Sequence, residues 1–318
     1  MKKTALICGV SGQDGAYLAK LLLSKGYEVW GSSRDAQGAS FSNLTALGIK
    51  DKVHFVSMVP EDFRSVLVAL HKSCPDEIYY LAGQSSVGLS FERPAETIQS
   101  IAFGILNVLE ACRMLDKAPR VYHAGSSECF GDTSGVSANE NTPFHPQSPY
   151  AVAKASAFWL VDNYREAYGL FACTGVLFNH ESLLRPERFV TQKIISTAKR
   201  IHAGSDESLE LGRLDISRDW GWAPEYVNAM WLMLQQDKAE DFVIATGQTN
   251  TLEKFVEVVF SELGLDYRKY TKQNVDFMRP TDLSVSLGDA TKAKNLLGWE
   301  AKYKMNDVVR MMIDGRTD

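Results

Sequence analysis

Short apolar, β-branched or aromatic runs alternate with longer amphipathic stretches over the first half of the chain. The apolar runs predict strands at Thr4–Cys8, Glu28–Ser32, Val53–Val56, Glu77–Leu81, Arg120–Ala124 and Ala172–Phe178. The stretches between them have the apolar spacing of helices, at Ala16–Lys25, Phe63–His71, Ala95–Leu115 and Pro149–Tyr168. Such alternation is typical of a parallel sheet covered by helices on both faces. We therefore expect an α/β fold with a doubly wound parallel sheet.

The regular alternation fades after Phe178. Loops are predicted there at Ser205–Ser208 and Asp215–Arg218, and helices at Glu225–Gln235, Leu252–Leu263 and Asn306–Asp314. We expect residues 1–178 to form the sheet domain and residues 179–318 to form mainly a smaller, substrate-binding lobe. Some exchange of chain between the two lobes is compatible with this pattern.

Charge and composition exclude several classes of protein. The chain has 318 residues, 45% of them hydrophobic and 23% charged, and a net charge of -5, which gives no general attraction for nucleic acid or anionic membranes. The apolar run before Gly9 is shorter than a signal peptide requires, and no run is long enough to cross a membrane, so the cytoplasm is the expected location. The cysteines form no C-x-x-C motif, and we expect neither disulfides nor a metal site.

A glycine-rich motif follows the first predicted strand. Gly9, Gly12 and Gly15 are spaced as G-x-x-G-x-x-G where the strand gives way to a helix. Glycines at this point allow a tight turn and a close approach to a pyrophosphate, whose charge is favoured by the free N–H groups of the helix N-terminus. A glycine-rich turn without a ligand is the alternative. The context predicts a Rossmann-type dinucleotide site that includes Gly9, Ser11, Gly12, Gln13, Asp14 and Gly15.

The end of the second predicted strand bears on which dinucleotide binds. An Asp or Glu at this point normally binds the ribose 2′-hydroxyl of NAD. Here the strand ends in Ser32, Ser33 and Arg34. Arg34 favours the 2′-phosphate of NADP, although the neighbouring Asp35 keeps NAD as an alternative.

Two further pairs of residues indicate acid–base chemistry. Tyr150 and Lys154 form Y-x-x-x-K in a predicted helix, which places both on one face. We expect the lysine to lower the pKa of the phenol from about 10, so that the tyrosine can accept a proton from a sugar hydroxyl. Ser126 and Glu128 follow the fifth predicted strand, where a parallel sheet presents its ligands. The alternative is that Ser126 and Ser127 cap the next turn and Glu128 is solvated.

Several longer motifs support a family resemblance. They are GVSGQDGAYLA from Gly9, YYLAGQSSVGLSFERP from Tyr79, GSSECFG from Gly125, SPYAVAK from Ser148, NYREAYG from Asn163, LFNHES from Leu177, RDWG from Arg218, and RPTD with GDATKAKNLLGW near the end. On these motifs the chain resembles, nearly end to end, the GDP-mannose 4,6-dehydratases of the extended short-chain dehydrogenase/reductase superfamily. Y-x-x-x-K is typical of the superfamily, whereas the Glu128 block and LFNHES are typical of the dehydratases.

The resemblance implies a role for particular residues. It implies catalytic roles for Ser126, Glu128, Tyr150 and Lys154, with Glu128 removing the C5 proton of the sugar. It adds Leu81 and Ala82 to the cofactor site, and it implies nucleotide-sugar contacts at Ser85, Asn179, Lys193, Arg218 and Arg279. The expected reaction removes water from GDP-mannose, with NADP regenerated in each cycle.

Three alternative functions remain open at this point. A GDP-manno-heptose could replace GDP-mannose, because Leu183, Leu184 and Arg185 stand where the family prefers paired arginines. A 4-reductase or 4-epimerase would use Tyr150 and Lys154 without needing Glu128. A non-catalytic NADP-sensing protein would keep the glycine loop alone. We further expect a homodimer or homotetramer, paired through the helices at Ala95–Leu115 and Pro149–Tyr168.

Overall fold

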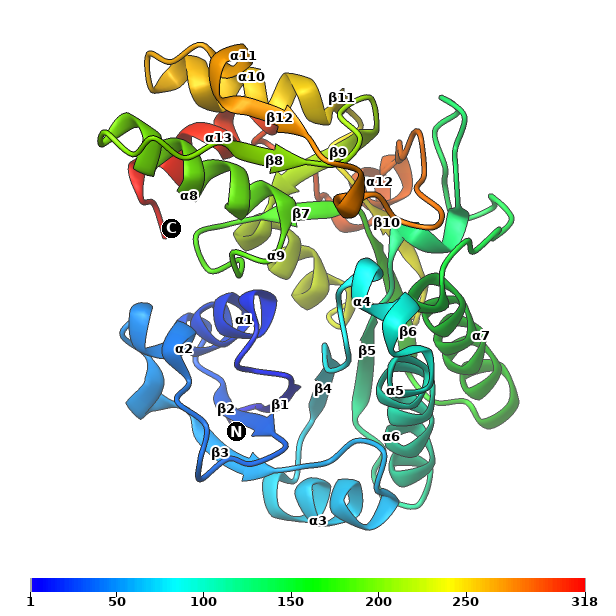
Figure 1. Cartoon of the computed structure of the whole chain (residues 1–318). Helices are drawn as coiled ribbons and strands as arrows, with labels where there is room; N and C mark the ends of the chain where they lie inside the picture. The colour runs from blue at the N-terminus through cyan, green and yellow to red at the C-terminus, as the bar shows by residue number, and fades with distance from the viewer. Residues whose placement is uncertain (1, 318) are drawn as a thin grey trace.

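A seven-stranded parallel sheet forms the centre of the molecule, in a computed structural model that describes residues 2–317 (Figure 1). The strand order is β10-β6-β5-β4-β1-β2-β3, so the chain starts in the middle and winds outward in both directions. The strands are β1 (Thr4–Cys8), β2 (Glu28–Ser33), β3 (His54–Ser57), β4 (Glu77–Tyr80), β5 (Arg120–Ala124), β6 (Ala172–Leu177) and β10 (Phe242–Ile244). The sheet is that of a doubly wound Rossmann fold, which confirms the predicted fold class.

Helices cover both faces of this sheet. One face packs against α1 (Gln13–Ser24), α2 (Ser42–Ala46), α9 (Ala223–Met233) and α12 (Thr291–Leu297). The other packs against α3 (Phe63–Ser73), α6 (Gly104–Arg113) and α7 (Pro149–Tyr168), with α4 (Val87–Glu92) and α5 (Pro94–Ile98) nearby. The two layers bury both sides of the central strands, which explains why these strands are mainly apolar, whereas the edge strand β3 is partly exposed.

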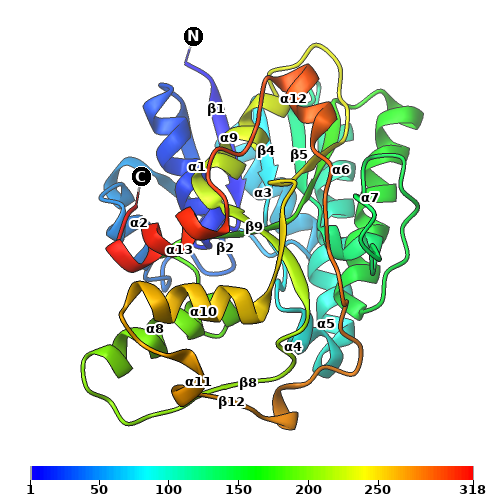
Figure 2. The same cartoon turned by 90° about the horizontal axis from the view of Figure 1, so that it is seen from above.

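The second lobe has its own apolar core. It is built from α8 (Val190–His202), α10 (Leu252–Glu262), α11 (Tyr267–Tyr270) and α13 (Met305–Asp314). Two small sheets complete it: β11 (Thr249–Thr251), β9 (Ser217–Trp222) and β7 (Asn179–Glu181) form one, and β12 (Thr271–Gln273) with β8 (Leu209–Leu211) forms the other. Seen from above, α8, α10 and the β8–β12 pair lie together beyond the end of the main sheet (Figure 2).

The chain crosses between the two lobes more than once. After leaving the sheet at β6 it builds β7, α8 and β9, then returns to the first layer as α9, which packs on α1, and as β10, which pairs with β6. The seventh strand of the main sheet, β10, comes from the part of the chain after residue 178. The predicted division at residue 178 between a cofactor-binding and a substrate-binding part therefore stays a prediction.

Two predicted elements differ from the structure. The helix predicted over Ala95–Leu115 is interrupted by a π-helical turn at Gln99–Phe103. The Tyr80 hydroxyl donates to the Ser100 carbonyl at 2.9 Å, and a Cβ on Gly104 would come within 1.9 Å of that hydroxyl oxygen. The tyrosine thus competes for a helical carbonyl, and the helix adapts locally.

The loop predicted at Asp215–Arg218 is wrong in its second half, because Ser217 and Arg218 begin β9. This strand buries Arg218 and Asp219, and a strand with buried charges lacks the apolar pattern by which strands are predicted.

Candidate active site

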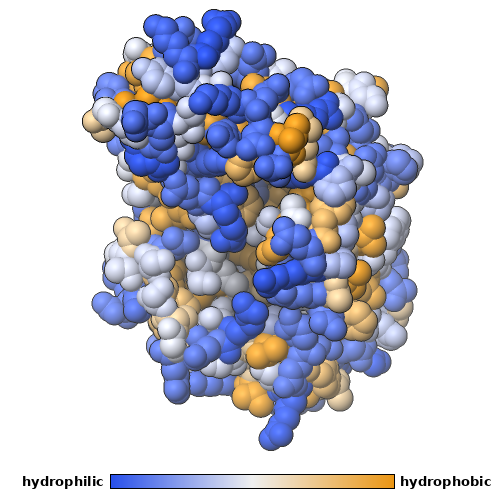
Figure 3. Space-filling model, viewed as in Figure 1, coloured by the Kyte–Doolittle hydropathy of each residue, from blue (hydrophilic) through white to orange (hydrophobic). Residues whose placement is uncertain are grey.

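A pocket of about 590 Å³ lies between the two lobes, at the carboxyl edge of the main sheet. The molecular surface is hollowed in the same region (Figure 3). Several of the predicted site residues line the pocket: Asp14, Leu81, Ser85, Ser126, Glu128, Tyr150, Lys154, Asn179, Lys193, Arg218 and Arg279. This edge is where a doubly wound sheet binds its ligands, because the loops after the parallel strands converge there.

The glycine loop makes the tight turn that its sequence predicts. Gly9 has a φ of +88°, and a Cβ on Gly15 would lie 2.4 Å from the Gly9 carbonyl oxygen. No side chain caps the N-terminus of α1 at Gly12, so the first N–H groups of the helix stay available to an anion. Ser11 lies in the same turn, and Ala82 is within 3.2 Å of the position of a Gly9 Cβ. These features fit a dinucleotide pyrophosphate.

Arg34 lies just beyond the end of β2 and is exposed. The neighbouring Asp35 is turned into its own loop, where its carboxylate accepts from the N–H groups of Gln37 and Gly38, both at 3.0 Å. The Asp35 carboxylate, which kept NAD as an alternative in the sequence, is thus occupied by backbone partners. The exposed Arg34 side chain extends into solvent.

The tyrosine and lysine lie side by side on α7, which begins at Pro149 behind a Ser148 cap. Both side chains are buried. The Lys154 ammonium donates to the Ala124 carbonyl at 2.6 Å and lies 5.8 Å from the centre of the Tyr150 ring. Ser126, two residues after β5, lies close enough to the Tyr150 hydroxyl to affect its pKa. Ser126, which follows β5, therefore lies close to the face of α7 that carries Tyr150 and Lys154.

The electrostatics of this pair differ from the sequence argument. Burial raises the pKa of Tyr150 above its ordinary value, and the nearby Ser126 hydroxyl opposes this only in part. Burial also lowers the pKa of Lys154 to about 8, against the opposing effects of Cys129 and Asp14. The prediction that the Tyr150 pKa is lowered was wrong, because it considered the charge of Lys154 but not the cost of removing both groups from water.

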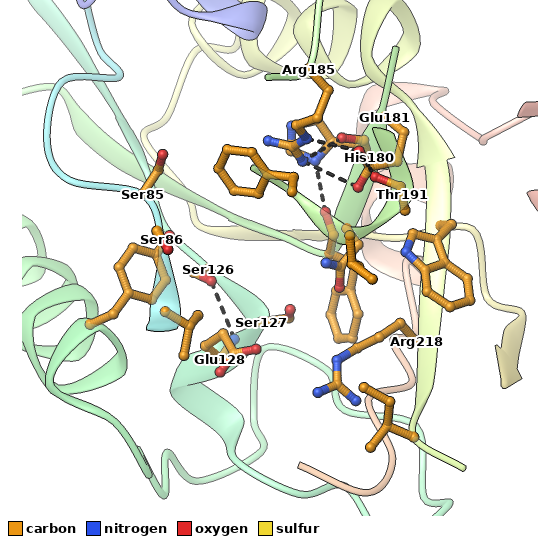
Figure 4. Close-up of a pocket in the computed structure, with 18 of the residues that line it drawn as sticks. Ser85, Ser86, Ser126, Ser127, Glu128, His180, Glu181, Arg185, Thr191 and Arg218 are labelled. Carbon is orange, nitrogen blue, oxygen red and sulfur yellow. Dashed lines mark hydrogen bonds and ion pairs between the residues drawn. The ribbon is translucent and has the colours of Figure 1, made fainter. Parts of the chain in front are cut away.

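Glu128 lies in a short 3₁₀ helix, Ser127–Phe130, directly after Ser126. Its N–H donates to the Ser126 hydroxyl at 3.3 Å, so Ser126 caps this turn as well as contacting Tyr150. The Glu128 carboxylate is partly buried and extends into the pocket (Figure 4). Desolvation raises its pKa, although Arg218 and Arg279 favour the charged form. The alternative of a fully solvated Glu128 is therefore wrong.

The residues predicted to contact a nucleotide sugar lie around the same pocket. Asn179 begins β7, and Ser85 precedes α4. Lys193, on α8, donates to the Glu210 carbonyl at 2.7 Å and lies 3.8 Å from the centre of the Phe277 ring. Desolvation lowers the pKa of Lys193. Its partners are a carbonyl and a ring face, so the ammonium can still pair with an anion.

A network that the sequence does not reveal joins the glycine loop to the second lobe. His180 contacts the Phe178 carbonyl at 2.7 Å and the Asp14 carboxylate at 3.0 Å. Despite its burial, Asp14 has a pKa lowered to about 2, because His180 and Arg185 favour its charged form. The Gln13 side chain completes the link through the His180 carbonyl and the Ser182 hydroxyl. The side chains of Gln13 and Asp14 therefore join the two lobes, while no side chain caps the helix that they begin.

Arg185 is another pocket residue to which sequence reasoning assigned no catalytic or binding role. Its guanidinium is paired with Glu181 at 2.8 Å and donates to the His180 carbonyl at 2.8 Å (Figure 4). Glu181 also accepts from Thr191 at 2.8 Å. In the sequence, only the position of Arg185 next to the LFNHES motif pointed to a role in the pocket. The burial of its side chain could not be predicted from the sequence alone.

Among residues 2–317, no group of His, Cys, Asp and Glu side chains is arranged to hold a metal ion. Within the same range no helix has the length and apolar character needed to span a membrane.

A parallel sheet in this order, a glycine loop after β1, and a tyrosine–lysine pair on the helix after β5 define an extended short-chain dehydrogenase/reductase. Comparison with known proteins narrows the class. A family model described as GDP-mannose 4,6 dehydratase matches residues 6–312. The chain belongs to the GDP-mannose 4,6-dehydratase family.

Individual relatives agree with this assignment. GDP-mannose 4,6 dehydratase 2 of Arabidopsis thaliana is 45% identical over 325 residues, which cover 98% of this chain and 86% of that protein. GDP-mannose 4,6-dehydratase of Sinorhizobium fredii (strain HH103) is 43% identical and covers 98% of this chain and 96% of its own length. Among solved structures, the dTDP-glucose 4,6-dehydratase DesIV of Streptomyces venezuelae has the same fold, with a TM-score of 0.87 at 20% identity and 98% coverage of both chains.

Proposed function

We propose that the chain removes water from GDP-mannose to give GDP-4-keto-6-deoxymannose, using a nicotinamide dinucleotide that is regenerated in every cycle. The observation that carries the proposal is the placement of Glu128 in the same pocket as Ser126, Tyr150 and Lys154. Reduction or epimerisation at C4 needs the tyrosine and lysine but has no use for a base at C5. The family relatives carry the name of this activity.

The pocket residues divide the proton transfers between them. In the phenolate form, which a positively charged nicotinamide and Lys154 would favour, Tyr150 takes the proton of the C4 hydroxyl, with the Ser126 hydroxyl close by. The Lys154 ammonium is held near the Tyr150 ring by its hydrogen bond to the Ala124 carbonyl. The bound nicotinamide supplies the hydride acceptor for C4 and the hydride donor for C6. Glu128 removes the C5 proton, which the C4 carbonyl makes acidic, and protonates the C6 hydroxyl as it leaves as water.

The glycine loop and strand ends would hold the cofactor, and the second lobe would hold the nucleotide sugar. Gly9, Gly12, Gly15, Leu81 and Ala82 surround the proposed dinucleotide site. On the substrate side, Lys193, Arg218 and Arg279 supply cations for the diphosphate, while Ser85 and Asn179 supply polar groups for the sugar.

The activity is tested by incubating the purified protein with NADP and GDP-mannose and analysing the products by mass spectrometry. We expect a nucleotide sugar lighter by one water, with no net consumption of NADP. Selective conversion of a GDP-manno-heptose in the same assay would move the proposal to that substrate. A product of unchanged mass would indicate an epimerase.

We propose that the cofactor is NADP and that Arg34 pairs with its 2′-phosphate. Arg34→Ala should then weaken NADP binding by roughly 1.5–3 kcal/mol, or about ten- to a hundredfold, and should leave NAD binding nearly unchanged. Dissociation constants for both dinucleotides can be measured by calorimetry, with exposed Arg64→Ala as the matched control. Equal losses for NADP and NAD would contradict this assignment.

We propose that two copies pair through α5–α6 and α7. These helices contact each other, and they expose Phe103 (54%), Met114 (65%), Val152 (43%) and Trp159 (59%) to solvent. A charge at the centre of such an interface is expected to cost about 2 kcal/mol or more, so Trp159→Glu should weaken association by roughly thirtyfold or more. Equilibrium sedimentation measures this. A wild-type monomer at micromolar concentration would contradict the proposed pairing.

A further inference from the structure

Four charged side chains from three separate segments meet at one end of the pocket. Glu128 comes from the 3₁₀ helix after β5, Arg218 from β9, and Arg279 and Asp282 from the segment that follows Phe277. Glu128 and Arg218 reach toward the same space from opposite sides (Figure 4). This grouping places the proposed C5 base beside the proposed diphosphate contacts.

Asp282 holds the two arginines together. One Arg218 nitrogen donates to the Leu283 carbonyl at 2.8 Å, and the other lies 2.9 Å from the Asp282 carboxylate. Arg279 approaches the same carboxylate oxygen at 3.7 Å. The Arg218 and Asp282 side chains are only 7% and 13% exposed, so their positions are fixed by the fold. Arg279 is 36% exposed and can move toward a ligand.

The charge of Glu128 depends on these arginines. Desolvation raises the pKa of Glu128, Arg218 and Arg279 lower it, and Asp282 raises it further. Tyr150 on α7 and Cys129 in the same 3₁₀ helix are the other titratable groups that interact electrostatically with Glu128. Both are neutral near pH 7, because burial raises the pKa of each above its usual value. The arginines are therefore the cations that favour the carboxylate form.

A nucleotide diphosphate would compete for the same positive charge. Its two negative charges pair with Arg218 and Arg279 in the proposed function, which would add negative charge to the end of the pocket that Glu128 lines, and a like charge disfavours the charged form of a carboxylate. We propose that Arg218 and Arg279 are shared between Glu128 and the substrate diphosphate, with Asp282 as the positioning residue, so that substrate binding itself makes Glu128 a stronger base. This inference rests on the proposed function.

The coupling suits both steps that Glu128 performs. A carboxylate of raised pKa is a better acceptor for the C5 proton, and the acid it becomes can still donate to the departing C6 hydroxyl at neutral pH. Without substrate, the arginines oppose the rise in the pKa of Glu128 that burial causes. The base thus reaches its full strength only when a diphosphate is in place.

Proton uptake on ligand binding gives a direct test. If the pKa of Glu128 rises on binding, the complex takes up a proton at any pH between the free and bound values. Calorimetric titration of GDP-mannose in buffers of different ionisation enthalpy counts these protons. Tyr150→Phe should serve as the common background, because it prevents turnover, and it is compared with Tyr150→Phe/Glu128→Gln. Each phosphoryl group of GDP-mannose is esterified on both sides and keeps only one strongly acidic hydroxyl, so its charge is constant near neutral pH and the ligand contributes no uptake.

We expect uptake of a fraction of a proton in the Tyr150→Phe protein and none when Glu128→Gln is added, and the double variant should bind GDP-mannose somewhat more tightly because the opposing charge is gone. Uptake that is equal in both proteins, or absent from both while binding persists, overturns the inference and leaves the dehydratase proposal standing. If neither protein binds GDP-mannose, both the dehydratase proposal and this inference are contradicted.

Asp282 gives a second, independent measurement. Asp282→Asn in the Tyr150→Phe background removes a carboxylate that opposes the charge of Glu128. The low-pH limit of proton uptake, which reports the pKa of Glu128 in the free protein, should therefore move to lower pH. Asp282→Glu should restore the original limit. A merely structural role for Asp282 predicts weaker binding with an unmoved profile, and that result would overturn the positioning role.

Discussion

Glu128→Gln is expected to lower the rate of overall dehydration by roughly 10²–10⁴, the range typical of a lost general base. The amide keeps the shape of the side chain but cannot take the C5 proton or return it to the leaving hydroxyl. Oxidation at C4 needs Tyr150, Lys154 and the cofactor, and these are untouched. Enzyme-bound NADPH should therefore appear in the near-ultraviolet absorbance when GDP-mannose is added, while little solvent deuterium should enter C5.

A matched control separates this effect from general damage. Glu166→Gln changes a carboxylate to an amide at an exposed position of α7, away from the substrate pocket, and should leave the rate unchanged. The role assigned to Glu128 is wrong if Glu128→Gln dehydrates at nearly the wild-type rate. It is equally wrong if the variant suppresses the NADPH signal as completely as a change at Tyr150 does.

Tyr150→Phe is expected to stop the reaction one step earlier, with a loss of rate of at least about 10²–10⁴. The phenyl ring fills the same space but cannot accept the C4 proton. The NADPH absorbance should therefore be suppressed together with product formation, whereas binding of GDP-mannose should barely change. Rapid-mixing absorbance and calorimetry measure the two quantities separately.

Tyr164→Phe is the matched control for this variant, because it removes a hydroxyl from the same helix outside the pocket, where Tyr164 hydrogen-bonds Glu110. It should be fully active. An NADPH signal of wild-type size in Tyr150→Phe would contradict the role of the phenol.

The strands of the main sheet could be predicted closely because they are buried on both faces. The boundaries of β1, β5 and α7 agree with the sequence pattern residue for residue. Parallel strands covered on both sides need continuous apolar runs, and such runs are the clearest signal in a sequence. The three-residue strand β10 is too short to give that signal, although it completes the same sheet.

The site could be predicted where it follows from topology. Residues after β1, β4 and β5 and on the first turns of α7 must meet at one edge of a parallel sheet, and the structure brings Asp14, Leu81, Glu128 and Tyr150 to one pocket there. Their catalytic and binding roles remain proposals. The contact between Asp14 and His180 could not be predicted, because it joins residues 166 positions apart in different lobes.

The pKa values were beyond sequence reasoning for a related cause. Sequence spacing gives the neighbours of a group on one helix, but desolvation depends on every element that covers it. Burial thus raises the pKa of Tyr150, where the helical spacing of Lys154 alone predicted a decrease. The same limit applies to Glu128, whose opposing cations come from β9 and from the segment around Arg279.

The most direct test of the dehydratase mechanism is to follow hydrogen from C4 to C6. GDP-mannose carrying deuterium at C4 should be incubated with the protein and NADP in ordinary water, and the product examined by NMR and mass spectrometry. The mechanism predicts that the 4-keto-6-deoxy product retains the deuterium and carries it in the C6 methyl group, with none at C5. A dehydrated product without deuterium at C6, or a product of unchanged mass with deuterium returned to C4, would contradict the mechanism.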